Sequence, residues 1–108
     1  MNNDVINKID NLIEVIKDSD IYKEYVDMLN KVDNSNEIKE LSNDIRKLNK
    51  KMITNPSIAL DKLLKEKEDA LNNIPLYNDY KDKLNELNNL LLVVKNKVDT
   101  FIKDVIIE

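Results

Sequence analysis

The sequence predicts an all-α fold: a small bundle of four to five helices, packed helix on helix around a long C-terminal helix. The 108 residues include no glycine and only two prolines, and 35% of them are charged. Without glycine, tight β-hairpins and phosphate-cradling loops are difficult to build. Apolar residues also recur at every third or fourth position along most of the chain, which is the period of an amphipathic helix. We expect a single domain over residues 1–108.

The N-terminal third predicts two helices. Residues 4–17 carry a wide apolar face and form the first. Asp18-Ser19-Asp20 then breaks the pattern, and Ser19 is a suitable N-cap for a short second helix over residues 21–32.

Two further helices are expected in the middle of the chain. Asn34, with Glu37 three residues later, resembles a capping box and predicts the start of the third helix, whose apolar residues follow heptad steps over residues 38–52. Asn55 and Pro56 then mark the clearest boundary, as the N-cap and first residue of a fourth helix that runs to Ile74. Because the chain lacks glycine, any left-handed C-cap must use an asparagine. The candidates are Asn34, Asn55 and Asn73.

The fifth helix is the longest. It starts at Pro75, whose fixed φ suits the first helical turn, and its apolar pattern continues to Ile106. The joint between Ile74 and Pro75 is either a kink or a full turn. At ~1.5 Å per residue, this helix would be about 48 Å long, more than the width of a 108-residue globule. Its apolar seam consists of Tyr77, Tyr80, Leu84, Leu87, Leu91, Val94, Val98, Phe101 and Val105, with a second row at Leu76, Leu90, Val93 and Ile102.

Either shorter helices pack end to end along this helix, or a second subunit covers the remainder. We expect a homo-oligomer, most simply a dimer, because so wide an apolar arc requires burial on two sides. The predicted interface comprises Leu84, Leu87, Leu91, Val93, Val94, Val98 and Phe101.

The composition excludes several kinds of chemistry. With no histidine and no cysteine, the chain cannot supply a Ser-His or Cys-His nucleophile, a thiolate or imidazole zinc site, or a disulfide. The carboxylates follow the usual polar faces of helices. We therefore expect no catalytic residue, cofactor or metal, and a protein that is not an enzyme. The N-terminus lacks the pattern of a signal peptide and no apolar run could span a bilayer, so we expect a cytoplasmic protein without a membrane partner.

One region of the acidic chain is basic. Residues 45–67 contain seven basic and two acidic side chains, a net charge of +5, whereas the whole chain carries −4. This region has three interpretations, given from the most to the least favoured: an ordinary solvated turn, a surface that docks an acidic partner, and a direct RNA-binding site. We expect no direct nucleic-acid binding. Lys67 lies in the apolar seam of the fourth helix, where it either fixes register or extends to solvent. We call the candidate docking residues the basic tip: Arg46, Lys47, Lys50, Lys51, Lys62 and Lys65.

The four tyrosines lie on apolar stripes. RNA stacking requires exposed rings beside cations, but the neighbours in sequence are mainly acidic, so we expect core or interface positions. The four tyrosines belong to two matching motifs, 55 residues apart. Both read Tyr-x-x-Tyr-x-Asp-x-Leu-Asn, and they start at Tyr22 and at Tyr77. Two equivalent halves, or similar helix starts that attract similar residues, explain this echo equally well.

The order of these segments resembles the YlbF/YmcA family of Firmicute bacteria, with the related YheA-like proteins. The resemblance rests on a short amphipathic helix followed by Lys17-Asp18-Ser19-Asp20-Ile21-Tyr22-Lys23-Glu24-Tyr25, then a heptad helix. Leu71-Asn72-Asn73-Ile74-Pro75-Leu76-Tyr77-Asn78-Asp79-Tyr80 then opens a long C-terminal helix. It covers nearly the whole chain and includes no catalytic motif.

The resemblance implies an all-helical, self-associating regulator of competence, sporulation and biofilm formation. Some members form a complex with a YaaT partner that steers the endoribonuclease RNase Y in mRNA processing and carries iron–sulphur clusters on cysteines. Cluster ligation cannot be carried over, since this chain has no cysteine. The leading hypothesis is a non-enzymatic adaptor whose partners are itself and related family members or RNA-processing proteins. The alternative is a purely structural oligomerisation module.

Overall fold

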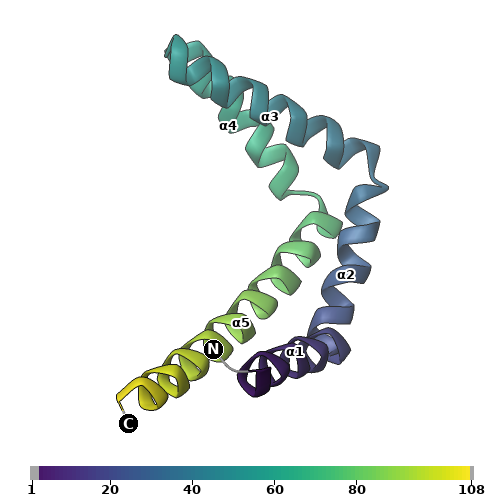
Figure 1. The fold of residues 1–108 in the computed structure, drawn as a ribbon. Helices are drawn as coiled ribbons and strands as arrows, with labels where there is room; N and C mark the ends of the chain where they lie inside the picture. Colours follow the sequence, from purple (N-terminus) through teal and green to yellow (C-terminus); the bar gives the residue numbers. More distant parts are fainter. Residues whose placement is uncertain (1–2, 108) are drawn as a thin grey trace. The chain divides into compact units, whose positions relative to one another are not determined.

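The computed structural model describes residues 3–107, which form five α-helices and no strand (Figure 1). The predicted all-α class with a long C-terminal helix is confirmed. α5 has 33 residues, a length of about 50 Å at the usual helical rise. The helices are α1 (Asn3–Asp18), α2 (Asp20–Asp33), α3 (Asn36–Thr54), α4 (Ile58–Asn72) and α5 (Pro75–Ile107).

The chain divides into two compact units, to which both α2 and α5 contribute. Unit 1 contains α1, the start of α2 up to Val26, and α5 from Asp82 onwards. Unit 2 contains residues 27–81, and therefore the end of α2, the whole of α3 and α4, and the first turns of α5.

Serine hydroxyls cap three of the helices at their N-termini. Oγ of Ser19 accepts a hydrogen bond from the backbone N–H of Tyr22 at 3.3 Å, which confirms the predicted cap of α2. Ser35 accepts in the same way at the start of α3, and Ser57 at the start of α4. Each cap satisfies one of the N–H groups that the first helical turn leaves without a partner.

The predicted capping box at the start of α3 is wrong by one residue. Ser35, not Asn34, is the N-cap and accepts from the N–H of Ile38. The amide of Asn34 instead donates to the carbonyl of Asn30 at 2.9 Å, which is at the end of α2. The connection between α2 and α3 is short, so the two residues have different roles. Asn34 binds the last turn of α2, and Ser35 caps the first turn of α3.

The predicted start of α4 is also wrong, because here too the asparagine ends the preceding helix and a serine caps the next one. Asn55 is the C-cap of α3, where its N–H donates to the carbonyl of Lys51 at 2.8 Å. Pro56 lies in the loop, and Ser57 caps a helix that begins at Ile58. A proline signals the break correctly, but a serine next to it decides where the new helix begins.

The joint before Pro75 is a turn between two separate helices. α4 ends at Asn72 and α5 begins at Pro75, as predicted for the proline. The amide of Asn78 donates to the carbonyl of Asn72 at 2.8 Å across this turn. No residue in the described part of the chain has a positive φ, so none of the three candidate asparagines is a left-handed cap.

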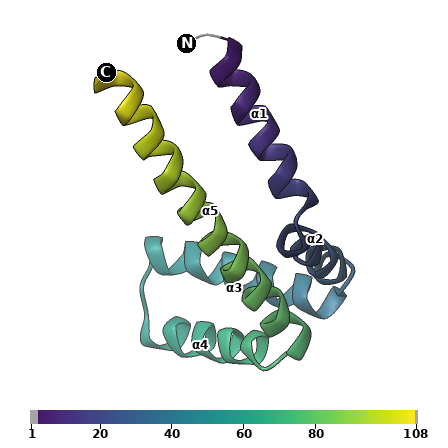
Figure 2. The same cartoon turned by 90° about the horizontal axis from the view of Figure 1, so that it is seen from below.

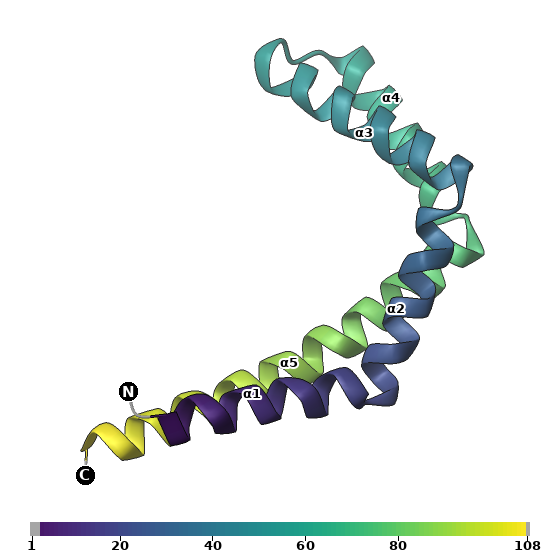
Figure 3. The same cartoon turned by 45° about the vertical axis from the view of Figure 1, so that its right-hand side comes forward.

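Unit 2 is built on the α3–α4 hairpin, whose helices lie side by side in Figure 2 and Figure 3. Its buried side chains are Ile38 (2% exposed), Leu48 and Leu71. Lys67 lies half-buried in α4, and its Nζ forms an ion pair with Asp44 of α3 at 3.4 Å. The polar position in the apolar seam thus pairs with the neighbouring helix.

Unit 1 pairs helices from the two ends of the chain. Figure 2 and Figure 3 show α1 beside the C-terminal half of α5, running in the opposite direction. Leu87 is the only buried side chain among the described residues of this unit. Nζ of Lys83 donates to Oε2 of Glu24 at 2.9 Å and connects α5 to the start of α2. Among residues 3–107, none of the helices combines the length and the hydropathy of a membrane-spanning segment.

Candidate protein-docking surfaces

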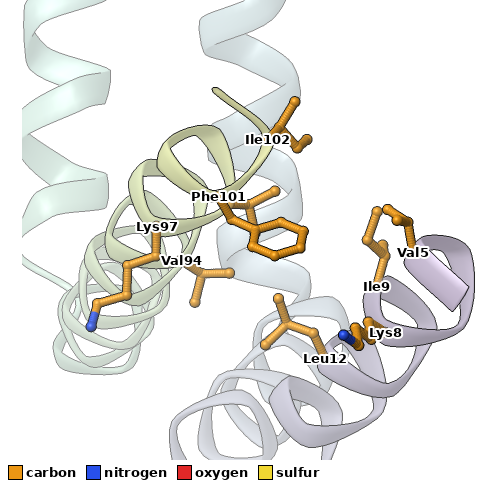
Figure 4. Close-up of a pocket in the computed structure, with 9 residues that line it drawn as sticks. Val5, Lys8, Ile9, Leu12, Val94, Lys97, Phe101 and Ile102 are labelled. Carbon is orange, nitrogen blue, oxygen red and sulfur yellow. The ribbon is translucent and has the colours of Figure 1, made fainter. Parts of the chain in front are cut away.

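An open apolar groove of about 280 Å³ lies between α1 and α5 in unit 1 (Figure 4). In Figure 4, the ring of Phe101 points from α5 into the space between the helices, toward Leu12 and Ile9 of α1. We call this surface the α1–α5 groove. Its lining residues are Val5, Lys8, Ile9, Leu12, Val94, Lys97, Val98, Phe101 and Ile102.

The spacing of the lining residues explains why they face one another. Val5, Ile9 and Leu12 follow each other at steps of four and three, as do Val94, Val98 and Phe101. Residues at these steps share one helix face. The two faces do not pack tightly against each other: α1 has no buried residue and Phe101 stays 46% exposed. The result is an apolar surface that remains open to a partner.

The structure divides the predicted interface residues among three environments. Leu84 is half-buried and Leu87 is buried within unit 1, so neither offers much surface to a second subunit. Val94, Val98 and Phe101 line the α1–α5 groove. The remaining two face solvent, with Leu91 at 40% and Val93 at 52% exposure.

Sequence reasoning missed two apolar features of unit 1. Leu92 is an exposed apolar residue between Leu91 and Val93. α1 supplies one wall of the groove, a role that its apolar pattern alone does not predict. The periodicity of α1 was visible in the sequence, but which helix lies opposite it depends on the tertiary structure.

The basic tip lies on the α3–α4 hairpin. Four of its residues are on α3 and two on α4, and all six side chains are exposed. None of the six forms an ion pair within residues 3–107. Two isoleucines that sequence reasoning did not single out flank the loop between the helices, with Ile53 at 82% and Ile58 at 90% exposure. Their positions outside the apolar seams of α3 and α4 could have identified them.

A model of the family described as control of competence regulator ComK, YlbF/YmcA, matches residues 5–103. The chain belongs to the YlbF/YmcA family. The match contains all lining residues of the α1–α5 groove and the whole basic tip. No curated protein and no solved structure gives a match.

The tyrosines of this YlbF/YmcA protein are all half-buried. In unit 2, the rings of Tyr77 and Tyr80 lie 6.2 Å apart. Nζ of Lys81 lies 5.3 Å from the centre of the Tyr77 ring and donates to Oδ1 of Asn72 at 3.0 Å. A cation therefore does lie over one ring, but the same lysine connects α5 to the end of α4, which gives the cluster a structural role at that turn.

Lys83 of this YlbF/YmcA protein forms ion pairs with two carboxylates, those of Glu24 and Glu86. The hydrogen bond to Glu24 raises the pKa of Lys83 above its ordinary value, and the charges of Glu24 and Glu86 act in the same direction. Glu86 lies 3.7 Å away on the same helix. This arrangement favours the charged ammonium and connects α5 to α2. Within the part of the chain that the structure describes, no three acidic side chains gather as a metal site would require.

Proposed function

We propose that this YlbF/YmcA protein is a non-enzymatic regulatory adaptor in the control of competence that acts through helical protein–protein contacts. The observation that carries the proposal is the open α1–α5 groove, together with the exposed apolar residues Leu91, Leu92 and Val93 beside it on α5. Grooves between helices that are lined by residues at steps of three and four are a common way to bind a partner helix.

Burial of this surface would supply the driving force for association. Each Å² of apolar surface removed from water contributes ~25 cal/mol. Leu91, Leu92 and Val93 are consecutive, and three successive residues of a helix span about 200° of its circumference. One partner helix in the groove would therefore leave part of this arc uncovered, which supports contacts on more than one side of α5.

We infer that a second copy of the chain is one of the partners, and that it packs against the exposed face of α5. The resulting homodimer would leave part of the surface for a further partner. The family resemblance suggests related family members or RNA-processing proteins for that role, in the cytoplasm. A complex of this kind would have to obtain any cysteine ligands from other subunits, because this chain has none.

The proposal is tested by charge substitutions on the exposed face of α5. Val93→Glu places a carboxylate in the expected contact and should abolish dimerisation while leaving helicity unchanged. Leu91→Glu should weaken both dimerisation and folding, because Leu91 is more covered by its own chain. The matched control is Val15→Glu, since Val15 is exposed on α1 and does not line the groove. Light scattering gives the mass and circular dichroism the helicity.

Co-purification from the native host distinguishes the adaptor from the structural alternative. The wild type should recover a regulatory or RNA-processing protein. The Val93→Glu variant should fail to recover either that protein or the second copy of the chain. Recovery of the protein alone, with no other component at any salt concentration, would support a purely structural oligomerisation module. A wild type that stays monomeric at high concentration would contradict the dimer.

A further inference from the structure

The loop end of the α3–α4 hairpin combines apolar and cationic side chains in an ordered way. On α3, Lys50 and Arg46 lie three and seven residues before the exposed Ile53. On α4, Lys62 and Lys65 lie four and seven residues after the exposed Ile58, and one acidic residue, Asp61, lies three residues after it. Residues at these spacings share one face of a helix. Both helices therefore present an isoleucine near the loop, with cations on the same face behind it.

The helical rise converts this pattern into layers. Cations three or four residues from an isoleucine are set back by ~5 Å, and those seven residues away by ~10 Å. The apolar layer is at the end of the hairpin and the cationic layers follow behind it. A lipid bilayer has the complementary order, with anionic headgroups outside an apolar interior.

We propose that the tip of the α3–α4 hairpin docks on the surface of an anionic lipid bilayer. Ile53 and Ile58 would enter the boundary between headgroups and acyl chains, and the basic side chains behind them would lie among the lipid phosphates. Docking of this kind needs no membrane-spanning helix. The expectation of no membrane partner rested on the absence of a spanning segment and did not consider these two isoleucines, which the structure shows to be exposed.

The composition of the tip favours a lipid surface over a protein partner. Protein interfaces are enriched in arginine and aromatic residues and depleted in lysine. The basic tip contains five lysines and one arginine, and residues 45–67 contain no aromatic residue. A headgroup layer attracts lysine and arginine alike, because the attraction is not directional. The three-residue loop is also narrow, which suits entry into a fluid surface better than a broad contact between rigid surfaces.

Charge would also orient the molecule. Residues 45–67 carry a net charge of +5 after Asp61 and Glu66 are counted, whereas the remaining residues carry −9 within the total of −4. An anionic surface therefore attracts the tip and repels the rest of the chain. Screening shortens the range of this attraction to ~8 Å at physiological salt, so binding should weaken as salt is added.

The chain contains no tryptophan, so a single introduced tryptophan reports on the tip without background. Ile58→Trp in the full-length protein should show a blue shift with vesicles that contain phosphatidylglycerol, and none with vesicles of phosphatidylcholine alone. Val15→Trp, at an exposed position on α1, is the control and should show no shift with either. Equal shifts with both kinds of vesicle, or a shift only at position 15, would overturn the proposal.

Vesicle flotation without a fluorophore separates the two components of the tip. The pair Lys50→Gln and Lys62→Gln should weaken binding about 25-fold, at about fivefold for each cation near the surface. The pair Ile53→Ser and Ile58→Ser should weaken it at least ~10-fold through the lost apolar area. Lys17→Gln, an exposed charge change on α1, should have little effect.

Light scattering and circular dichroism on the same variants keep this proposal separate from the one on α5. The tip variants should keep the mass and helicity of the wild type. A reduced mass would mean that the tip lies between copies of the chain, which would overturn lipid docking. Absence of binding to phosphatidylglycerol vesicles, with loss of a co-purified protein from the lysine pair, would assign the tip to an acidic protein instead.

Discussion

The α3–α4 hairpin and the α1–α5 pair are both made of amphipathic helices that run in opposite directions, yet the hairpin buries more side chains than the pair does. The hairpin contains the buried residues Ile38, Leu48 and Leu71, whereas α1 buries none and faces α5 across an open groove. A three-residue loop holds α3 against α4, while α1 and the facing half of α5 belong to opposite ends of the chain. The difference shows that equal periodicity does not guarantee equal burial. The incompletely covered pair is where we expect a partner.

The largest expected effect is on the closed hairpin. Leu48→Ala removes a buried side chain and should lower the free energy of unfolding by about 3 kcal/mol, because the cavity adds to the lost transfer energy. Leu92→Ala, at an exposed position on α5, should lower it by less than about 1 kcal/mol. Urea denaturation followed by circular dichroism measures both values. Equal losses would mean that α5 is as closely packed as the hairpin, and would remove the contrast between the two pairs.

Truncation within the open groove should have a smaller effect, and on association rather than folding. Phe101→Ala removes a half-exposed ring and should weaken self-association by about 1–2 kcal/mol, in proportion to the apolar area lost from the interface. Sedimentation equilibrium gives the dissociation constant, and thermal unfolding of the dilute protein checks the fold. A large drop in melting temperature without a change in association would place Phe101 in the core of unit 1 instead.

The ion pair across the hairpin should contribute less again. Asp44→Asn should cost about 0.5 kcal/mol, since both partners are partly exposed and screened by solvent. Lys67→Met alone, and the two changes together, complete a double-mutant cycle that isolates the pair. A coupling energy near zero in this cycle would leave Lys67 as a solvated lysine with no part in holding α3 to α4.

The smallest expected effect concerns Lys83 and has a defined pH range. Since the folded pKa of Lys83 is raised by Glu24, the stabilisation is fully present below the ordinary lysine pKa of about 10.5 and is lost as pH rises through the folded pKa. Lys83→Gln should therefore lower the melting temperature slightly at neutral pH, and the difference from the wild type should shrink as pH rises through the raised pKa of Lys83. A difference that stays constant across this range would exclude the charge as its cause.

Much of the local structure could be predicted from the sequence. The apolar periodicity located the five helices, because burial of one face imposes steps of three and four on any helix in a bundle. Pro75 marked the start of α5 because its missing N–H is not needed in the first turn. The starts of α3 and α4 were displaced because Asn34 and Asn55 each have a serine within two residues. Short polar side chains can cap either of two adjacent helices, so the pattern leaves their division undecided.

The sequence by itself determined which face of each helix is apolar and which kinds of chemistry the chain cannot perform. Only the tertiary structure decided what covers each face. The row of α5 that reads as continuous is divided in space: Leu87 is buried by its own chain, Val98 lines a groove and Leu91 faces solvent. Ile53 and Ile58 similarly gain their significance from the hairpin that places them at one end. The physical reason is that periodicity records a helix's need for burial, whereas the identity and distance of the opposing surface depend on contacts between residues far apart in the chain.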